Sequence, residues 1–233
     1  MSYFQTENLR TLALVGHGSC GKTTLIEAML YRSGMIPEPG TVERGNTMCD
    51  NDALEKEVGH SIRLAVAHID TAMPNLTPVR IHVLDTPGYP DYIGQDLSAL
   101  DAVKSVAAVI DATKGVDLFT QRMMDMAAER KLCRMIVVNK CDVPEANLEE
   151  LLAEMQAIWG PGVLPINLPT QNHAHVIDCF EREEGESDIM SVADVHRAFI
   201  ERIVEEDDEQ LERYLEQGSV DPRTLHPLIT KAL

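Results

Sequence analysis

Short apolar runs alternate along the chain with longer segments whose apolar residues recur every three or four positions. The short runs are typical of buried β-strands, and the longer segments are typical of amphipathic helices. This alternation predicts an α/β fold with a mostly parallel sheet and helices on both faces. The predicted strands are Leu12–Val15, Ile62–Ile69, Val79–Leu84, Val106–Ile110 and Met135–Val138, and the predicted helices are Thr24–Arg32, Gln95–Lys104, Thr120–Lys131 and Glu145–Trp159.

Two stretches depart from the alternation. Ile62–Ile69 and Val79–Leu84 are joined by a short Pro- and Asn-containing connection without a helix, so we expect these two strands to pair in antiparallel fashion. Residues 33–60 are long, charged and punctuated by Gly and Pro, with no sustained periodicity. Connections of this length inside a domain are usually functional, so we expect a mobile functional loop.

The character of the chain changes after Trp159. Val163–Leu168 and His175–Phe180 are typical of short strands, and Val192–Glu206 and Glu209–Gln217 are typical of helices, with a third helix beginning near Pro222. We therefore expect a main domain over 1–165 and a small α+β subdomain over 166–233.

Composition narrows the cellular setting. With 233 residues and 44% hydrophobic side chains, the chain can build a substantial core, and no apolar run is long enough to span a bilayer. The first residues lack the basic and apolar stretches of a signal peptide. Five scattered cysteines, an odd number, indicate reduced thiols. We expect a cytoplasmic protein without membrane contact.

The net charge of −18 argues against direct nucleic-acid binding by this chain, because phosphate contacts need Lys and Arg. Residues Glu181–Glu216 hold 14 acidic and 4 basic side chains, a net charge of −10. More than half of the excess charge therefore lies in the last third of the chain, where we expect a partner to dock.

The first chemical motif lies between Leu12–Val15 and the helix Thr24–Arg32. A strand, a Gly-rich loop and a helix in this order form a phosphate-binding loop, whose backbone amides and helix N-terminus attract phosphate. Lys22 is expected to reach the β- and γ-phosphates, and the Thr23 hydroxyl to coordinate Mg²⁺. The predicted phosphate-binding residues are Gly16, His17, Gly18, Ser19, Cys20, Gly21, Lys22, Thr23 and Thr24.

Two further motifs follow two later strands. Asp85-Thr86-Pro87-Gly88 comes directly after Val79–Leu84, where Asp85 can hold Mg²⁺ through water and the Gly88 amide can donate to a γ-phosphate. Asn139-Lys140-Cys141-Asp142 comes directly after Met135–Val138.

The motif at Asn139–Asp142 suits guanine. Asp142 can accept hydrogen bonds from guanine N1 and N2, Asn139 can contact the O6/N7 edge, and the Lys140 stem can lie across the ring. Adenine would leave the carboxylate of Asp142 unpaired, and such sites reject analogues steeply. Three motifs at three strand ends predict a domain that binds GTP and GDP.

These motifs and their spacing resemble the translational GTPases, most closely the elongation factor G family. The resemblance runs from about Asn8 to the last residue. It implies a Ras-like P-loop GTPase domain bearing a small α+β G′ insert. In that family a last strand follows the insert; since nothing after Leu233 supplies it, the resemblance implies the N-terminal part of a longer multidomain protein.

The chain departs from the family pattern at several positions. In that family the loop before the second strand ends in Arg-Gly-Ile-Thr-Ile, and the corresponding residues here are Val58-Gly59-His60-Ser61-Ile62. Ser61 thus takes the place of the threonine that senses Mg²⁺ and γ-phosphate. Tyr89 replaces the histidine that positions the attacking water. Together with Pro90 it resembles the sequence motif of bacterial elongation-factor-G-like paralogues. A phenol is a poor base near neutral pH. Ser19 replaces an aspartate.

The resemblance implies a GTPase and a ribosome-coupled conformational switch. Its expected catalytic residues are Lys22, Gly88 and Tyr89, and its Mg²⁺ ligands are Thr23, Ser61 and, through water, Asp85. We expect a monomer that meets the ribosome through the full-length protein. Glu201, Glu205 and Asp208, spaced for one helical face, coincide with acidic positions that the family's insert turns towards the ribosomal stalk protein.

Three alternatives stay open from the sequence. Tyr89 is also compatible with a weakly hydrolysing module that senses GTP and GDP. Another translational GTPase, of the ribosome-protection or release-factor type, would share the same motifs. The acidic residues of the insert also fit an ordinary solvated face.

Overall fold

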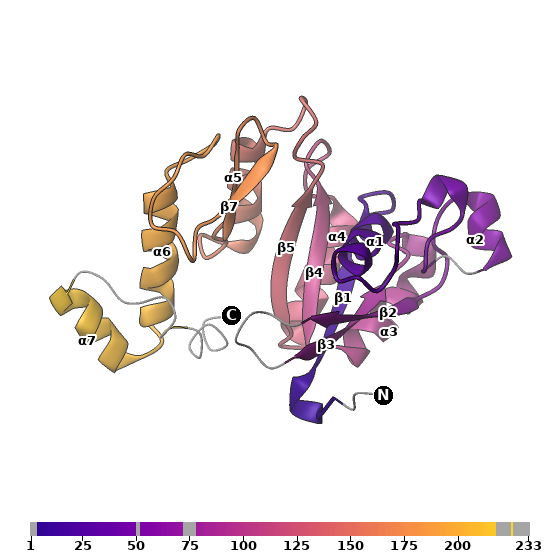
Figure 1. Ribbon diagram of the computed structural model, residues 1–233, viewed down its shortest axis with the longest axis horizontal. Coiled ribbons are helices and arrows are strands. Elements are labelled where there is room, and N and C mark those ends of the chain that lie inside the picture. Colours follow the sequence, from indigo (N-terminus) through magenta and orange to yellow (C-terminus); the bar gives the residue numbers. More distant parts are fainter. Residues whose placement is uncertain (1–3, 50–51, 72–77, 218–224, 226–233) are drawn as a thin grey trace. The chain divides into compact units, whose positions relative to one another are not determined.

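Five strands form one sheet in the order β2-β3-β1-β4-β5 (Figure 1). The structure, a computed structural model, describes residues 4–49, 52–71, 78–217 and 225. The chain separates into two compact units, Met1–Asn139 and Lys140–Leu233, which are described one at a time. The sheet strands, all in the first unit, are β1 (Leu9–Val15), β2 (Ala65–Thr71), β3 (Val79–Asp85), β4 (Ser105–Asp111) and β5 (Cys133–Asn139).

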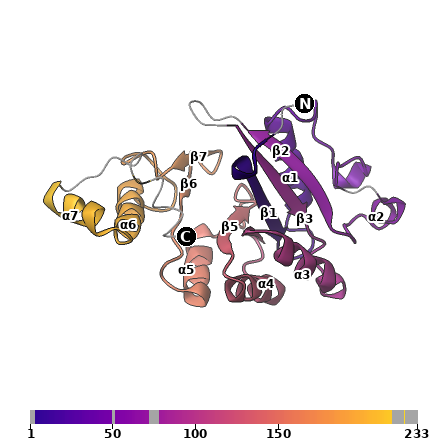
Figure 2. The ribbon, with the colours of Figure 1, turned by 90° about the horizontal axis from the view of Figure 1, so that it is seen from below.

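The sheet is parallel except at one edge. β1 pairs in parallel with β3 and β4, and β4 pairs in parallel with β5, whereas β2 runs antiparallel to β3. Helix α1 (Lys22–Arg32) covers one face, and α3 (Ile93–Ala102) and α4 (Leu118–Glu129) cover the other (Figure 2). Six of the seven β4 residues are buried, as expected for a strand with neighbours on both sides and helices on both faces. The predicted α/β fold with a mostly parallel sheet is confirmed.

The segment between α1 and β2 holds two short helices that the sequence pattern did not reveal. These are the 3₁₀ turn η2 (Val42–Arg44) and helix α2 (Ala53–Val58). Helix α2 begins with a capping box, in which the Asp52 and Glu55 side chains satisfy each other's backbone amides. Six residues are too few to display a helical period, so the helix depends on its cap and on tertiary contacts.

Strand β2 begins at Ala65, three residues later than predicted. The amides of Ile62 and Arg63 donate to the Glu55 carboxylate, both at 2.9 Å, and are therefore engaged with a side chain. The predicted antiparallel pairing of β2 with β3 is confirmed, with His68 opposite His82 and Asp70 opposite Arg80.

The second unit joins a hairpin to helices. It holds α5 (Leu148–Trp159), the antiparallel strands β6 (Asn167–Thr170) and β7 (His175–Asp178), α6 (Val192–Val204) and α7 (Asp208–Gln217). Its core brings the hairpin against α6, with the Phe180 and Phe199 rings meeting edge to face at 5.7 Å. The predicted helix near Pro222 lies outside the described residues. The proposed boundary at residue 165 stays a prediction. No helix in the described part of the chain is long and apolar enough to cross a bilayer.

Candidate functional site

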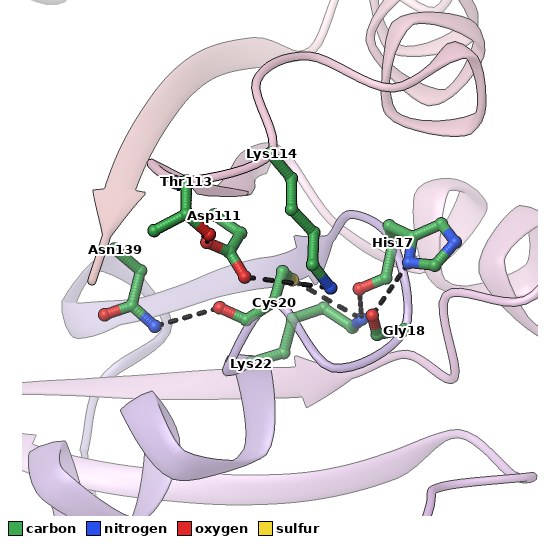
Figure 3. A network of polar contacts seen from close by, with 8 residues as sticks. All are labelled: His17, Gly18, Cys20, Lys22, Asp111, Thr113, Lys114 and Asn139. Atoms are coloured by element: carbon green, nitrogen blue, oxygen red, sulfur yellow. Dashed lines mark hydrogen bonds and ion pairs between the residues drawn. The ribbon is translucent and has the colours of Figure 1, made fainter. Parts of the chain in front are cut away.

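The phosphate-binding loop joins β1 to α1 and wraps around a lysine. Gly21 caps α1 in the left-handed conformation, at φ +101°, which a residue with a Cβ seldom adopts. Lys22 is 5% exposed, and its ammonium donates to the carbonyl oxygens of Gly16 at 2.8 Å and His17 at 3.1 Å. The two carbonyls together fix the position of the ammonium, and Figure 3 shows the contact with His17.

Three oxygen-bearing side chains from distant segments meet at the start of α1. The Thr23 hydroxyl donates to Asp85 Oδ2 at 2.6 Å and lies 3.4 Å from the Ser61 hydroxyl. Thr23 and Asp85 are buried, and Ser61 is half-buried. Hydroxyl and carboxylate oxygens are the ligands that Mg²⁺ prefers, so this donor set fits that ion.

The Asp85–Gly88 turn is tied to both the sheet and the phosphate loop. The Thr86 hydroxyl donates to the carbonyl of Leu14 on β1 at 2.9 Å, and the Gly18 amide donates to the Gly88 carbonyl at 2.9 Å. Gly88 has a φ of +77°, and a Cβ there would overlap the Gly16 carbonyl and the Lys22 ammonium. A glycine is therefore required where the turn approaches the loop.

Asn139 links the third motif to the first. Its Nδ2 donates to the Cys20 carbonyl at 2.9 Å, so the end of β5 supports the phosphate loop (Figure 3). Lys140 has a φ of +60°, and Asp142 is exposed. Lys140 and Asp142 belong to the second compact unit, and their contact with guanine stays a prediction.

Four rings lie beside the phosphate loop, and we call them the ring cluster: His17, His60, Tyr89 and Tyr92. The centroid of Tyr89 is 4.7 Å from that of His60 and 6.1 Å from that of His17, and His60 is 6.5 Å from Tyr92. A Cβ on Gly18 would overlap the Tyr89 ring, so this glycine makes room for the phenol. Tyr89 was predicted as a site residue, whereas His60 was not.

A small cavity of about 120 Å³ lies on the side of the phosphate loop that faces β4. Lys114 extends from the loop after β4 towards the phosphate loop, with its ammonium 3.9 Å from Asp111 Oδ2 (Figure 3). Asp111 also accepts from the Thr113 hydroxyl at 2.7 Å. Sequence reasoning missed this loop because it carries no strand-end motif. The cavity is lined by His17, Gly18, Cys20, Val109, Asp111, Lys114, Gly115 and Asp117.

Cys20 is a buried thiol rather than a reactive one. Burial raises the pKa of the Cys20 thiol, and the neighbouring Lys22 ammonium offsets only part of that rise. The protonated thiol is the weakly nucleophilic form. Cys20 therefore fills space in the loop while its carbonyl accepts the bond from Asn139.

Two buried glutamates hold the segment between α1 and β2. Glu27 of α1 is 1% exposed and accepts hydrogen bonds from the amides of Gly40 at 2.8 Å and Met48 at 2.5 Å. Glu55 is 5% exposed and accepts from the amides that follow Ser61. The sequence did not indicate that either glutamate bonds backbone amides, because those amides are up to 21 positions away from the glutamate in the chain.

The acidic residues predicted to meet a partner lie in the second unit and are exposed. The expectation that Glu201, Glu205 and Asp208 share one helical face is wrong. Helix α6 ends at Val204, and Asp208 begins α7. Residues 205–207 lie outside both helices. The Asp207 side chain accepts from the Gln210 amide and so caps the start of α7, which favours a new helix over the continuation of α6. Glu205 pairs with Arg202 at 3.1 Å.

Comparisons with known proteins point to one group. The Elongation factor Tu GTP binding domain family matches residues 7–225. The elongation factor G-like protein of Mycobacterium tuberculosis is 32% identical over 97% of this chain and 33% of its own length. Peptide chain release factor 3 of Streptococcus pyogenes is 32% identical over 69% of this chain and 31% of its own length. A crystal structure from Thermus thermophilus matches 96% of this chain and 35% of its own, with a TM-score of 0.81 and 33% identity. The chain thus spans about a third of these relatives.

Proposed function

The chain belongs to the Elongation factor Tu GTP binding domain family, and from that membership we propose that it binds GTP and GDP and hydrolyses GTP as the switch domain of an elongation factor G-like translational GTPase. The observation that carries the proposal is the meeting of Thr23, Asp85 and Ser61. Ser61 and Asp85 are 38 and 62 positions from Thr23 in the sequence, yet their oxygens lie next to its hydroxyl at the end of the phosphate loop.

The phosphates would lie along the loop from Gly16 to Thr24. Lys22 would exchange its bonds to the Gly16 and His17 carbonyls for bonds to the β- and γ-phosphates. The Gly88 amide would donate to the γ-phosphate. Thr23 and Ser61 would hold Mg²⁺ directly and Asp85 through water, and the ion would neutralise charge on the β- and γ-phosphates.

The base would be selected by the segment after β5. Asp142 would accept from guanine N1 and N2, with Asn139 at the O6/N7 edge and Lys140 across the ring. Asn139 already supports the loop through Cys20, which favours a base site next to the phosphate site. Replacement of Asp142 by Ala is expected to weaken GTP binding and to reduce its preference over ATP.

The terminal phosphate would act through the two segments that carry Ser61 and Gly88. Its contacts would hold residues 33–61 and 85–97 in one arrangement, and hydrolysis would release them. Phosphoryl transfer needs positioning and charge stabilisation more than covalent chemistry. With Tyr89 in the ring cluster we expect slow intrinsic turnover and stimulation by a large partner on the order of 10³-fold.

The partners belong to the same proposal. We expect the ribosome to supply the stimulation, through the full-length protein that carries this chain. The ribosomal stalk protein would meet the exposed acidic residues of the insert, Glu201, Glu205 and Asp208. None of the five cysteines, all among the described residues, forms a disulfide, which fits the reducing cytoplasm that we propose as the location.

The decisive experiment measures phosphate release from GTP with and without ribosomes, for the full-length protein and for Tyr89→His. Ribosome-stimulated release by the unsubstituted protein is the expected result. Tyr89→Phe serves as the matched control, because it keeps the ring and removes only the hydroxyl. Nucleotide affinity, measured in parallel with fluorescent GTP and GDP, separates loss of binding from loss of chemistry.

A binding module is the second candidate, because Tyr89 occupies the space over Gly18 next to the phosphate loop. Such a module would bind GTP and GDP without stimulated hydrolysis. Tight binding without release by the unsubstituted protein, together with release by Tyr89→His, would favour this function over the enzyme.

A further inference from the structure

His60 is the half-buried residue of the ring cluster that lies nearest to Tyr89, with the ring centroids 4.7 Å apart and the planes tilted by 47°. It immediately precedes Ser61, and Tyr89 immediately follows Gly88. Ser61 and Gly88 are the two residues proposed to reach the metal and the γ-phosphate from their two segments. Each of these segments therefore places a ring next to its phosphate-sensing residue, and the two rings lie together.

The orientation of the imidazole follows from a backbone contact. His60 Nδ1 lies 3.3 Å from the Ser61 carbonyl oxygen. A carbonyl oxygen can only accept, so this bond requires the proton on Nδ1. In the neutral ring, Nε2 is then the acceptor, and its lone pair can receive a hydrogen from a water. The backbone contact thus leaves Nε2 of the neutral ring as a hydrogen-bond acceptor beside Tyr89.

Gly18 and Tyr92 are the neighbours of the two rings on either side. The Tyr89 ring occupies the space that a Cβ on Gly18 would take, and Tyr92 lies 6.5 Å from His60. No other histidine in the described residues lies within the same cluster except His17, whose Nδ1 contacts the Gly18 carbonyl at 2.8 Å. His60 is thus the imidazole that adjoins both phosphate-sensing segments.

We propose that His60 positions the attacking water in GTP hydrolysis, with Tyr89 packed against its ring; this rests on the function proposed above. The water oxygen bonds to the γ-phosphorus while the bond from that phosphorus to the β–γ bridging oxygen breaks and leaves its electron pair on GDP. One water proton passes to a phosphate oxygen. His60 accepts a hydrogen bond from the water and ends the step unchanged, which is the role of a water-orienting residue in phosphoryl transfer.

The test compares four versions of the full-length protein: the unsubstituted protein, His60→Ala, His60→Gln and His68→Ala. His68 is the matched control, because it is an exposed histidine on β2 outside the ring cluster. Two quantities are measured for each protein. One is the affinity for fluorescent GDP and for a non-hydrolysable GTP analogue. The other is the single-turnover rate of phosphate release from GTP with the protein in excess.

We expect His60→Ala to lower the single-turnover rate by about 10- to 100-fold, because a misplaced reactant costs a factor of that order. Both nucleotide affinities should stay unchanged. His60→Gln should recover part of the rate, because the amide oxygen can accept from a water. His68→Ala should match the unsubstituted full-length protein.

Three outcomes would overturn the proposal while leaving the proposed function intact. They are an unchanged rate in His60→Ala, a parallel fall in rate and nucleotide affinity, and a His60→Gln variant no faster than His60→Ala. Absence of phosphate release from the unsubstituted full-length protein, also after ribosomes are added, would instead contradict the proposed hydrolysis, and the role of His60 with it.

Discussion

Gly18 and Tyr89 share a space that holds only one side chain. A Cβ on Gly18 would overlap the Tyr89 ring, and Gly18 is buried. We therefore expect Gly18→Ala to lower the free energy of unfolding by about 1–3 kcal/mol, as overpacking does. Chemical denaturation measures this change. In a Tyr89→Ala background the same substitution should have little effect, because the ring that it displaces is absent.

The control for this prediction is Gly94→Ala. Apart from its chain neighbours and the backbone of its own helix, no described atom lies within 4 Å of the position that a Cβ on Gly94 would take. Gly94 is in helix α3, where alanine raises helix propensity by up to about 1 kcal/mol. Equal destabilisation by the two alanines, or a Gly18→Ala penalty that survives Tyr89→Ala, would contradict the steric explanation.

Asp96 of α3 is a buried carboxylate that the proposed chemistry does not use. It is fully buried, and neither of its oxygens has a hydrogen-bond partner within the described residues. Burial raises the pKa of Asp96, and Thr86 and Lys22, which are close by, offset only part of that rise. Its ionised form is therefore disfavoured in the folded chain.

Asp96→Asn should raise the free energy of unfolding at pH 7 by about 1–2 kcal/mol, because a neutral amide replaces a buried charge. An Asp with a raised folded pKa stabilises most below its unfolded pKa of about 3.9 and loses that contribution as the pH rises through the folded pKa. The advantage of the variant should thus disappear towards acid pH, as measured by denaturation across the pH range. The exposed Asp125→Asn is the control; an advantage that grows towards acid pH would refute the burial argument.

At the scale of elements, two buried carboxylates bond backbone amides that lie outside helices and strands in the segment between α1 and β2. Glu27 bonds the amides of Gly40 and Met48, and Glu55 bonds those of Ile62 and Arg63. The second pair follows Ser61 directly, so Glu55 fixes the backbone next to the proposed metal ligand. The segment is therefore held by a few side-chain bonds that a nucleotide can complement or break.

We expect Glu55→Ala to speed amide hydrogen exchange at Ile62 and Arg63 and to lower the free energy of unfolding by about 1–3 kcal/mol, since it leaves amides without their acceptor. Binding of a GTP analogue should weaken more than binding of GDP, because Ser61 is proposed to sense only the triphosphate. Glu57→Ala, an exposed position on the same helix, is the matched control. Faster exchange in both variants, or an equal loss of the two nucleotides, would argue against this role.

Across the whole molecule, charge is concentrated where the partner is proposed to dock. Neutralising Glu201, Glu205 and Asp208 to Gln, Gln and Asn should slow association with the ribosomal stalk protein at low ionic strength by several-fold. The difference should shrink as salt is added, because screening weakens steering. Stopped-flow association kinetics at several salt concentrations provide the measurement.

The control neutralises Glu183, Glu184 and Glu186, which are also exposed in the second unit and change the net charge equally. Equal slowing by both triple variants would show that total charge, rather than this acidic position, governs association. Because Glu201 and Asp208 are on different helices, α6 and α7, the first triple variant changes charge on two helices rather than on one helical face.

The strands, the sheet class and the three strand-end motifs could all be predicted from the amino-acid sequence, because each depends on residues that are close together in the chain. Apolar runs identify β4, and the Gly-Lys-Thr order identifies the phosphate loop, whatever surrounds them. The meeting of distant residues became visible only in the folded chain. His60 lies on Tyr89, Glu55 replaces strand pairing at Ile62, and α6 ends before Asp208. These outcomes depend on contacts between side chains that are far apart in the sequence and on short helix caps. Neither produces a periodic pattern of hydrophobic residues from which it could be predicted.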